Sequence, residues 1–145
     1  MGASELIKMT PLKVSNLKYL ANGDIDCRVV WDVFPDTEMP FTASEKDPEE
    51  HGRLLYNKIF SGEYGIIEKY SEEDRKNDEI NSRLILRNQA ISKSNIIISV
   101  LSEEREAGII SDSDLHTWKK WIKYRKDLRE INLDSPDIIW PNEPI

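Results

Sequence analysis

Strict alternation of apolar and polar residues marks the stretch 24–33. One face would carry the apolar members Ile25, Cys27, Val29, Trp31 and Val33, and the other would carry Asp24, Asp26, Arg28 and Asp32. This pattern is typical of a half-buried antiparallel strand. Asn22-Gly23 predicts a turn back to a partner strand at 16–20. A two-residue loop would put Lys18 on the apolar face, whereas a three-residue loop with a left-handed Gly23 pairs Tyr19 with Ile25. We favour the second register because it keeps one face apolar.

A third strand and a short helix are predicted next along the chain. Residues 39–43 suit a strand, and Asp47, Pro48 and Glu50 suit the start of a helix as its N-cap, first residue and capping-box partner. The helix should end near Gly62 and turn its apolar side chains toward the hairpin, namely Leu54, Leu55, Ile59 and Phe60. Residues 1–70 therefore predict a small α+β domain.

The second half of the chain predicts an antiparallel helical hairpin. Leu84, Ile91, Ile98 and Leu101 recur at intervals of seven and three residues, which indicates a long amphipathic helix over 72–107. By propensity alone, Ile96-Ile97-Ile98 also suits a strand. Gly108 should end the first helix and residues 111–114 should cap a second one. That second helix should bury an apolar face made of Leu115, Trp118, Ile122, Leu128, Ile131 and part of Arg125. We thus predict an α+β chain with a domain at 1–70, a helical hairpin at 71–135 and an extended, proline-rich tail at 136–145.

Charge and composition limit which partners and which cellular compartment we expect for the chain. The formal net charge of −7 argues against nucleic acid and against anionic membranes. The sequence contains no run of about eighteen apolar residues, so we expect no membrane span. A secretory signal pattern is missing, and the lone Cys27 suits a reducing compartment. We therefore expect a chain that is made and used inside a cell.

Catalytic chemistry finds little support in the residues. The histidines, His51 and His116, lie in different segments, and no Cys or carboxylate spacing around them suits a zinc site. His51 is either a functional base or a packed side chain, and Cys27 on an apolar strand face is most simply a buried small residue. Gly62-Glu63-Tyr64-Gly65 lacks the lysine of a phosphate loop and suits a helix stop. We therefore predict no enzyme, no cofactor and no bound metal.

Aromatic residues in the second half suit protein binding. Trp118, Trp121 and Tyr124 lie on one predicted helix at different angles around its axis, so we do not expect all of them to face the helical seam. Either Trp118 is core while Trp121 or Tyr124 covers the edge, or one of the three anchors a partner. Trp140, in the tail, either clamps the tail to the domain or docks on a partner.

Two runs of special residues carry a resemblance to a known family. The first is Pro40-Phe41-Thr42-Ala43, then Asp47-Pro48-Glu49, His51-Gly52-Arg53, Leu55-Tyr56 and Ser61-Gly62-Glu63-Tyr64-Gly65 with Ile67. The second is Leu115, Trp118, Tyr124-Arg125, Leu128, Ile131 and Ile139-Trp140-Pro141. Over roughly 14–70 and 113–142, the chain resembles the tail fibre assembly proteins, or tail assembly chaperones, of tailed bacteriophages. Many relatives carry a proline-rich linker between the halves, where this chain has a long charged helix.

The resemblance implies a helper that binds the C-terminal end of a trimeric phage tail fibre in the host cytoplasm and promotes its assembly. Such a helper either leaves afterwards or stays in the particle. The region 16–65 would make the contact, and the helical hairpin would serve as a scaffold or a handle for self-association. The candidate partner-binding residues are Trp31, Phe41, Tyr56, Tyr64, Trp121, Tyr124 and Trp140. The alternative from composition is a small acidic inhibitor, or immunity-type protein, that neutralises a basic partner.

Overall fold

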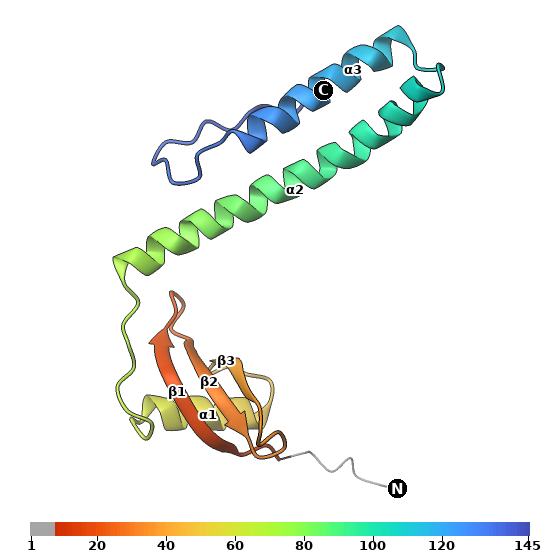
Figure 1. The fold of residues 1–145 in the computed structure, drawn as a ribbon. Coiled ribbons are helices and arrows are strands. Elements are labelled where there is room, and N and C mark those ends of the chain that lie inside the picture. Colours follow the sequence, from red (N-terminus) through yellow and green to blue (C-terminus); the bar gives the residue numbers. More distant parts are fainter. Residues whose placement is uncertain (1–7) are drawn as a thin grey trace, which may run out of the picture. The chain divides into compact units, whose positions relative to one another are not determined.

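Three strands, one short helix and two longer helices follow one another in the computed structural model, which describes residues 8–145 (Figure 1). They are β1 (Pro11–Tyr19), β2 (Ile25–Trp31), β3 (Glu38–Ala43), α1 (Glu50–Phe60), α2 (Glu72–Glu106) and α3 (Asp112–Arg129). The chain divides into two compact units whose boundary falls between Arg75 and Lys76, early in α2. The predicted α+β class, with a sheet before a helical hairpin, is confirmed.

The strands form an antiparallel sheet in the order β1-β2-β3. Tyr19 pairs with Ile25, and the Leu20 amide donates to the Asp24 carbonyl at 2.8 Å, so the predicted hairpin register is confirmed. Gly23 has φ +89°, the left-handed conformation that the three-residue loop requires. The predicted third strand is also present, because Cys27 pairs with Phe41.

β1 begins at Pro11, earlier than the predicted 16–20, and contains a bulge. Ser15 pairs with Arg28 and Lys18 with Asp26, so two β1 residues lie opposite Cys27 alone. One of them, Asn16, has φ 55°, which asparagine tolerates better than most residues. The extra residue lets both Val14 and Leu17 turn inward although they are three positions apart. The bulge therefore keeps Val14 and Leu17 on the core side, whereas Leu12, earlier on the strand, is 59% exposed.

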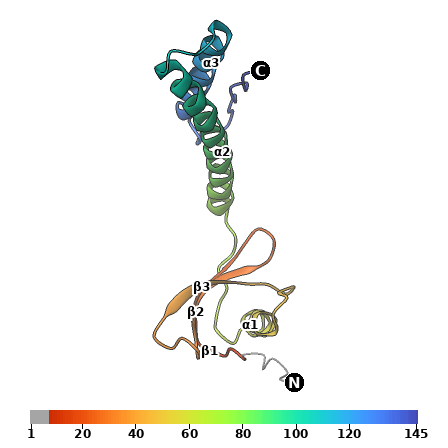
Figure 2. The same ribbon diagram turned by 90° about the vertical axis from the view of Figure 1, so that its right-hand side faces the viewer.

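Helix α1 covers one face of the sheet (Figure 2). Leu55 and Ile59 are buried there against β2 residues such as Val29. The prediction that Leu54 and Phe60 also face the hairpin is wrong, because these side chains are 53% and 63% exposed. At about 100° per residue, Leu55 and Ile59 fill the inner stripe and place their neighbours on the two flanks.

The start of α1 also differs from the prediction. The helix begins at Glu50 after Glu49, and the Asp47 Oδ1 atom accepts the Glu49 amide at 2.8 Å instead of capping the helix. The Asp47 carboxylate lies where a side chain on Gly52 would be, 2.0 Å from an added Cβ. Arg53 Nη1 donates to the Asp47 carbonyl at 2.6 Å and to the Pro48 carbonyl at 2.9 Å. Asp47-Pro48 and Gly52-Arg53 of the sequence motif therefore contact each other at the start of α1.

Capping hydrogen bonds mark the beginnings of the two long helices. At α2, Ser71 Oγ accepts the Asp74 amide at 3.1 Å while Asp74 Oδ2 accepts the Ser71 amide at 2.8 Å, a reciprocal capping box. Helix α2 includes 96–98, so the strand alternative for this stretch is wrong. At α3, Ser111 accepts from the Asp114 amide, as the sequence predicted. Both helices have the predicted extent to within a few residues.

The interior of the helical hairpin is thinner than predicted. Leu128 is buried, whereas Leu115, Trp118, Ile122 and Ile131 are only partly buried. Trp121 occupies the interior instead. Trp118 and Trp121 are three residues apart and differ by only about 60° around the helix axis, so apolar spacing alone did not decide which tryptophan turned inward.

Candidate partner-binding surfaces

A stacked pair of aromatic rings lies on the flank of α1, with Phe60 exposed and Tyr56 partly buried. Tyr56 and Phe60 stack with ring centroids 5.9 Å apart and an interplanar angle of 12°. Burial raises the pKa of the Tyr56 hydroxyl, and the nearby Glu45 and Asp24 carboxylates add to this shift. We call Tyr56 and Phe60 the aromatic face. It combines an apolar surface with neighbouring negative charge on an ordered helix.

The turn after α1 holds the next candidate, Tyr64. This side chain packs partly against the core, and burial, followed by the charge of Glu63, raises the pKa of its hydroxyl. The glycines on either side, Gly62 and Gly65, have φ of +90° and +101°. Both glycines meet the backbone demand of a tight turn, which agrees with the predicted helix stop.

Trp31 lies in the interior of the N-terminal unit. Only 1% of it is exposed, and its ring meets the edges of Phe41 and His51, each at a centroid distance of 5.4 Å. His51 also borders a hollow of about 180 Å³ with Glu49 and Glu50. Among residues 8–145 its ring forms no hydrogen bond to a carboxylate and packs at a right angle to Trp31, which favours the packed histidine. Trp31 offers a partner no accessible surface, while Phe41 is partly exposed.

The aromatic residues of α3 take different roles. Trp121 is buried and meets Tyr124 edge to face at 5.7 Å. Trp118 Nε1 donates to Ser102 Oγ on α2 at 2.9 Å, and the Arg105 guanidinium lies 4.9 Å from the centroid of its indole ring. Trp118 thus joins the two helices, Trp121 lies in the interior, and Tyr124 borders an open groove.

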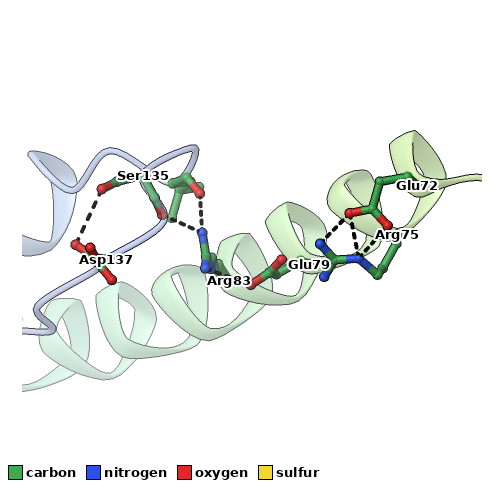
Figure 3. A network of polar contacts seen from close by, with 7 residues as sticks. Glu72, Arg75, Glu79, Arg83, Ser135 and Asp137 are labelled. Carbon is green, nitrogen blue, oxygen red and sulfur yellow. Dashed lines mark hydrogen bonds and ion pairs between the residues drawn. The ribbon is translucent and has the colours of Figure 1, made fainter.

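The tail folds back on the helical hairpin. Arg83 Nη1 donates to the Leu133 carbonyl at 2.9 Å and to the Ser135 carbonyl at 2.8 Å, while Arg83 Nη2 binds Glu79 (Figure 3). An ion pair between Lys93 and Glu143 ties the end of the tail to α2. Trp140 is nevertheless 37% exposed. The tail is therefore attached by polar contacts and keeps its tryptophan partly accessible.

A groove of about 350 Å³ opens between α3 and the tail. We call it the tail groove; its lining residues are Lys120, Lys123, Tyr124, Asp127, Pro141, Asn142 and Pro144. The sequence interpretation identified Tyr124 and Pro141 as motif residues but did not connect them. Their juxtaposition depends on the return of the tail, which no periodicity in the sequence reports.

Groups suited to catalysis or metal binding are sparse in residues 8–145. No cluster of three or more His, Cys, Asp or Glu side chains in this range is placed to hold a metal ion. Cys27 is buried, and burial together with the charge of Asp26 raises the pKa of its thiol to about 11. Among the described residues, no helix is both long enough and apolar enough to cross a bilayer.

In each unit, the predicted contact residues divide into interior side chains and accessible ones. Trp31 and Trp121 are interior, and each touches a more accessible candidate, Phe41 and Tyr124 respectively. Phe60 was missed, although its spacing of four residues from Tyr56 was a readable signal. The lysines of the tail groove were missed as well.

Comparison with protein families decides the identity of the chain. The family model described as "Caudovirales tail fibre assembly protein, lambda gpK" matches residues 55–145. The chain belongs to this family. The match covers more than half of the sequence, from the middle of α1 through the tail, and the role of the chain is therefore phage tail fibre assembly. No curated protein and no solved structure matches the chain.

Proposed function

We propose that the chain is a non-enzymatic chaperone that binds the C-terminal region of a phage tail fibre and promotes its trimerisation in the host cytoplasm. The observation that carries the proposal is the family match over 55–145, which includes the aromatic face and the tail groove. The interwoven β-rich trimers of a fibre have many non-local contacts and fold slowly, with exposed strand edges on the way. A chaperone that covers such surfaces prevents their aggregation.

The aromatic face is the contact that the geometry favours in the N-terminal unit. Phe60 is exposed although it is large and apolar, and Tyr56 holds its ring in a fixed orientation by stacking. Aromatic side chains of this kind lose little conformational entropy on binding and often dominate interface energies. Phe41 and Tyr64, which are partly exposed beside the same core, extend the proposed contact region.

The binding proposal can be tested by co-expression with the C-terminal part of the neighbouring fibre, affinity capture and mass determination of the eluate. We expect a soluble fibre trimer only when the chain is present, and we expect Phe60→Ser to abolish most of the capture. Leu12→Ser is the matched control, because Leu12 is similarly exposed at 59% but lies on β1. Trimerisation of the fibre without the chain, with no capture, would contradict the proposal.

Self-association through the helical hairpin belongs to the same proposal. The exposed side of α2 carries Ile85, Ile96 and Val100, which fall within about 60° of one another around the helix axis. Such a stripe suits weak helix pairing. Sedimentation of the full chain over a range of concentrations should show a reversible dimer, and Ile96→Ser should remove it. A monomer at every concentration would contradict self-association and leave fibre binding intact.

A further inference from the structure

The exposed side of α3 is basic in an otherwise acidic chain. Between residues 119 and 129 its exposed cationic side chains are Lys119, Lys120, Lys123, Lys126 and Arg129. Asp127 pairs with Lys123 at 2.8 Å and Glu130 approaches Lys126 at 3.9 Å. Among residues 8–145, no carboxylate forms an ion pair with Lys120. The net charge of −7 for the whole chain therefore hides a local excess of positive charge.

The tail groove lies within this basic surface. Lys120 and Lys123 border it on α3, while Tyr124, Pro141 and Pro144 supply apolar lining. The tail side of the groove is fixed, because Arg83 holds the Leu133 and Ser135 carbonyls and Lys93 pairs with Glu143. A groove with one wall of ordered prolines needs little rearrangement to accept a ligand.

Hydrogen-bonding chemistry in the groove favours an acceptor-rich ligand. Burial, followed by the charge of Glu143, raises the pKa of the Tyr124 hydroxyl, so this group keeps its proton and can donate. Lys120 and Lys123 are donors as well. Asp127 is already engaged with Lys123. A ligand with carboxylates beside an apolar side chain would use both the donors and the prolines.

We propose that the tail groove binds an acidic, extended peptide segment of the protein partner. The assignment of that segment to the fibre rests on the proposed function, whereas the preference for acidic peptide rests on the groove alone. An extended segment suits the site because tyrosine and proline rings form flat apolar surfaces, and such a segment presents its side chains at alternate positions. A second copy of this chain fits less well. Its acidic stretch at 72–74 is helical, and Asp74 is already paired with Lys18 at 2.7 Å.

The groove can be tested without the fibre, by titrating the full ¹⁵N-labelled chain with a short end-capped peptide that carries Asp and Glu around a central Ile. A peptide with Lys in place of both acids is the control ligand. We expect shifts in the amide signals of Lys120, Lys123 and Asn142 with the acidic peptide alone, and weakening of its binding as salt is raised. Equal binding of the basic peptide, or shifts confined to residues away from the groove, would overturn the proposal.

Charge-matched variants separate the groove from the general basic surface. Lys120→Glu with Lys123→Glu should weaken acidic-peptide binding by at least about tenfold, in line with the loss of close charge pairs. Lys119→Glu with Lys126→Glu makes the same change in net charge at positions outside the groove lining, and should weaken binding about twofold. Equal losses in both pairs would show diffuse attraction and overturn the groove. A ¹⁵N spectrum like that of the wild type verifies the fold of each variant.

The same variants in the fibre capture experiment distinguish failure of the groove from failure of the proposed function. Loss of capture with Lys120→Glu and Lys123→Glu, but not with the control pair, would assign the acidic segment to the fibre. Normal capture by both pairs would leave fibre binding intact and overturn the assignment of the segment to the fibre. Dimerisation that depends on Lys120 and Lys123 would show that a second copy is the occupant, contrary to the proposal.

Discussion

The two units of the chain bury very different interiors. The N-terminal unit encloses a contiguous apolar cluster in which Ile25, Val29, Ala43 and Ile59 have no exposed surface. In the C-terminal unit the fully enclosed residues are Leu128 and the hydroxyl-bearing Ser94, while Ile98 and Trp121 each keep 7% exposed. One unit is thus stabilised mainly by apolar burial, and the other has a narrow apolar seam.

In the helical hairpin, polar contacts hold the elements together where apolar burial is small. Trp118 bonds to Ser102, Arg125 Nη1 bonds to Asn95 Oδ1 at 2.8 Å, and Arg83 holds the tail. The Nε atoms of Arg87 and Arg125 are buried without a hydrogen-bond partner among the described residues. Polar seams of this kind gain little net stability compared with apolar cores, and they open more readily. The comparison teaches that the sheet unit suits a rigid platform and that the hairpin unit suits adjustment to a partner.

Equivalent truncations in the two units give the largest expected effect. Ile59→Ala should lower the free energy of unfolding of the N-terminal unit by roughly 2–5 kcal/mol, because a cavity opens in a closed core. Ile98→Ala should cost about 2 kcal/mol or less, since the thinner seam can collapse around the missing atoms. Urea unfolding followed by residue-resolved NMR on the full chain measures both values. Equal costs would break the comparison.

Loss of the arginine that holds the tail comes next. Arg83→Ala removes two charge-assisted hydrogen bonds to backbone carbonyls, which we expect to weaken tail docking by about 1.5–3 kcal/mol. Amide hydrogen exchange of residues 131–145 should then accelerate while exchange in the sheet stays unchanged. Arg75→Ala is a control on the same helix, because Arg75 pairs with the Glu72 carboxylate. Unchanged exchange in the tail would show that other contacts hold it.

A close approach in the N-terminal unit gives a smaller expected effect. Gly52→Ala forces the Asp47 side chain to move, because an added Cβ would lie 2.0 Å from Asp47 Oδ2. Overpacking costs about 1–3 kcal/mol, and the better helix propensity of alanine offsets up to about 1 kcal/mol. The double variant with Asp47→Ala should recover part of the loss in a thermal melt. Additive losses would show that Asp47 is not the obstacle.

Regular patterns in the sequence predicted the helices and strands. Their exact ends depended on which of several possible local hydrogen bonds formed. The hairpin register followed from the turn at Gly23 and from the requirement that Ile25 pair with an inward Tyr19. The start of α1 did not follow, because Asp47 can bond either the next turn or the helix, and the two choices look alike in sequence.

The candidate surfaces were harder to predict than the fold. The tail groove needs contacts that span sequence separations as long as that between Lys93 and Glu143, and no local pattern encodes them. Trp118 and Trp121 are both tryptophans on the same predicted helix face. Only the packing of α2 against α3 decides that Trp121 is buried and Trp118 partly buried. The sequence motif therefore identified positions that matter, but it did not show which of them pack in the interior and which are free to bind a partner.

The smallest expected effect is a pH dependence of the N-terminal unit at acid pH. The hydrogen bond from Lys18 holds the pKa of the Asp74 carboxyl at about 2, below its ordinary 3.8, and the bonds from Ser71 add to this. Because the folded state lowers this pKa, the stabilisation is complete above pH 3.8 and is lost as the pH falls toward 2. Asp74 in turn raises the pKa of Lys18 above 10.5, so the Lys18 contribution is complete below that pH and is lost above it.

Acid titration of the full chain, followed by thermal melts, should therefore show a small loss in the melting temperature of the N-terminal unit between pH 3.8 and 2. Asp74→Asn should flatten that part of the profile, because the amide cannot titrate and the ion pair is already lost at neutral pH. Asp36→Asn, in the β2–β3 loop, removes a carboxylate that takes no part in the Lys18–Asp74 ion pair and serves as the control. A transition of equal size in the C-terminal unit would contradict the prediction, since both members of the ion pair belong to the N-terminal unit. The titration thus reports on each unit separately and tests whether the two interiors respond independently.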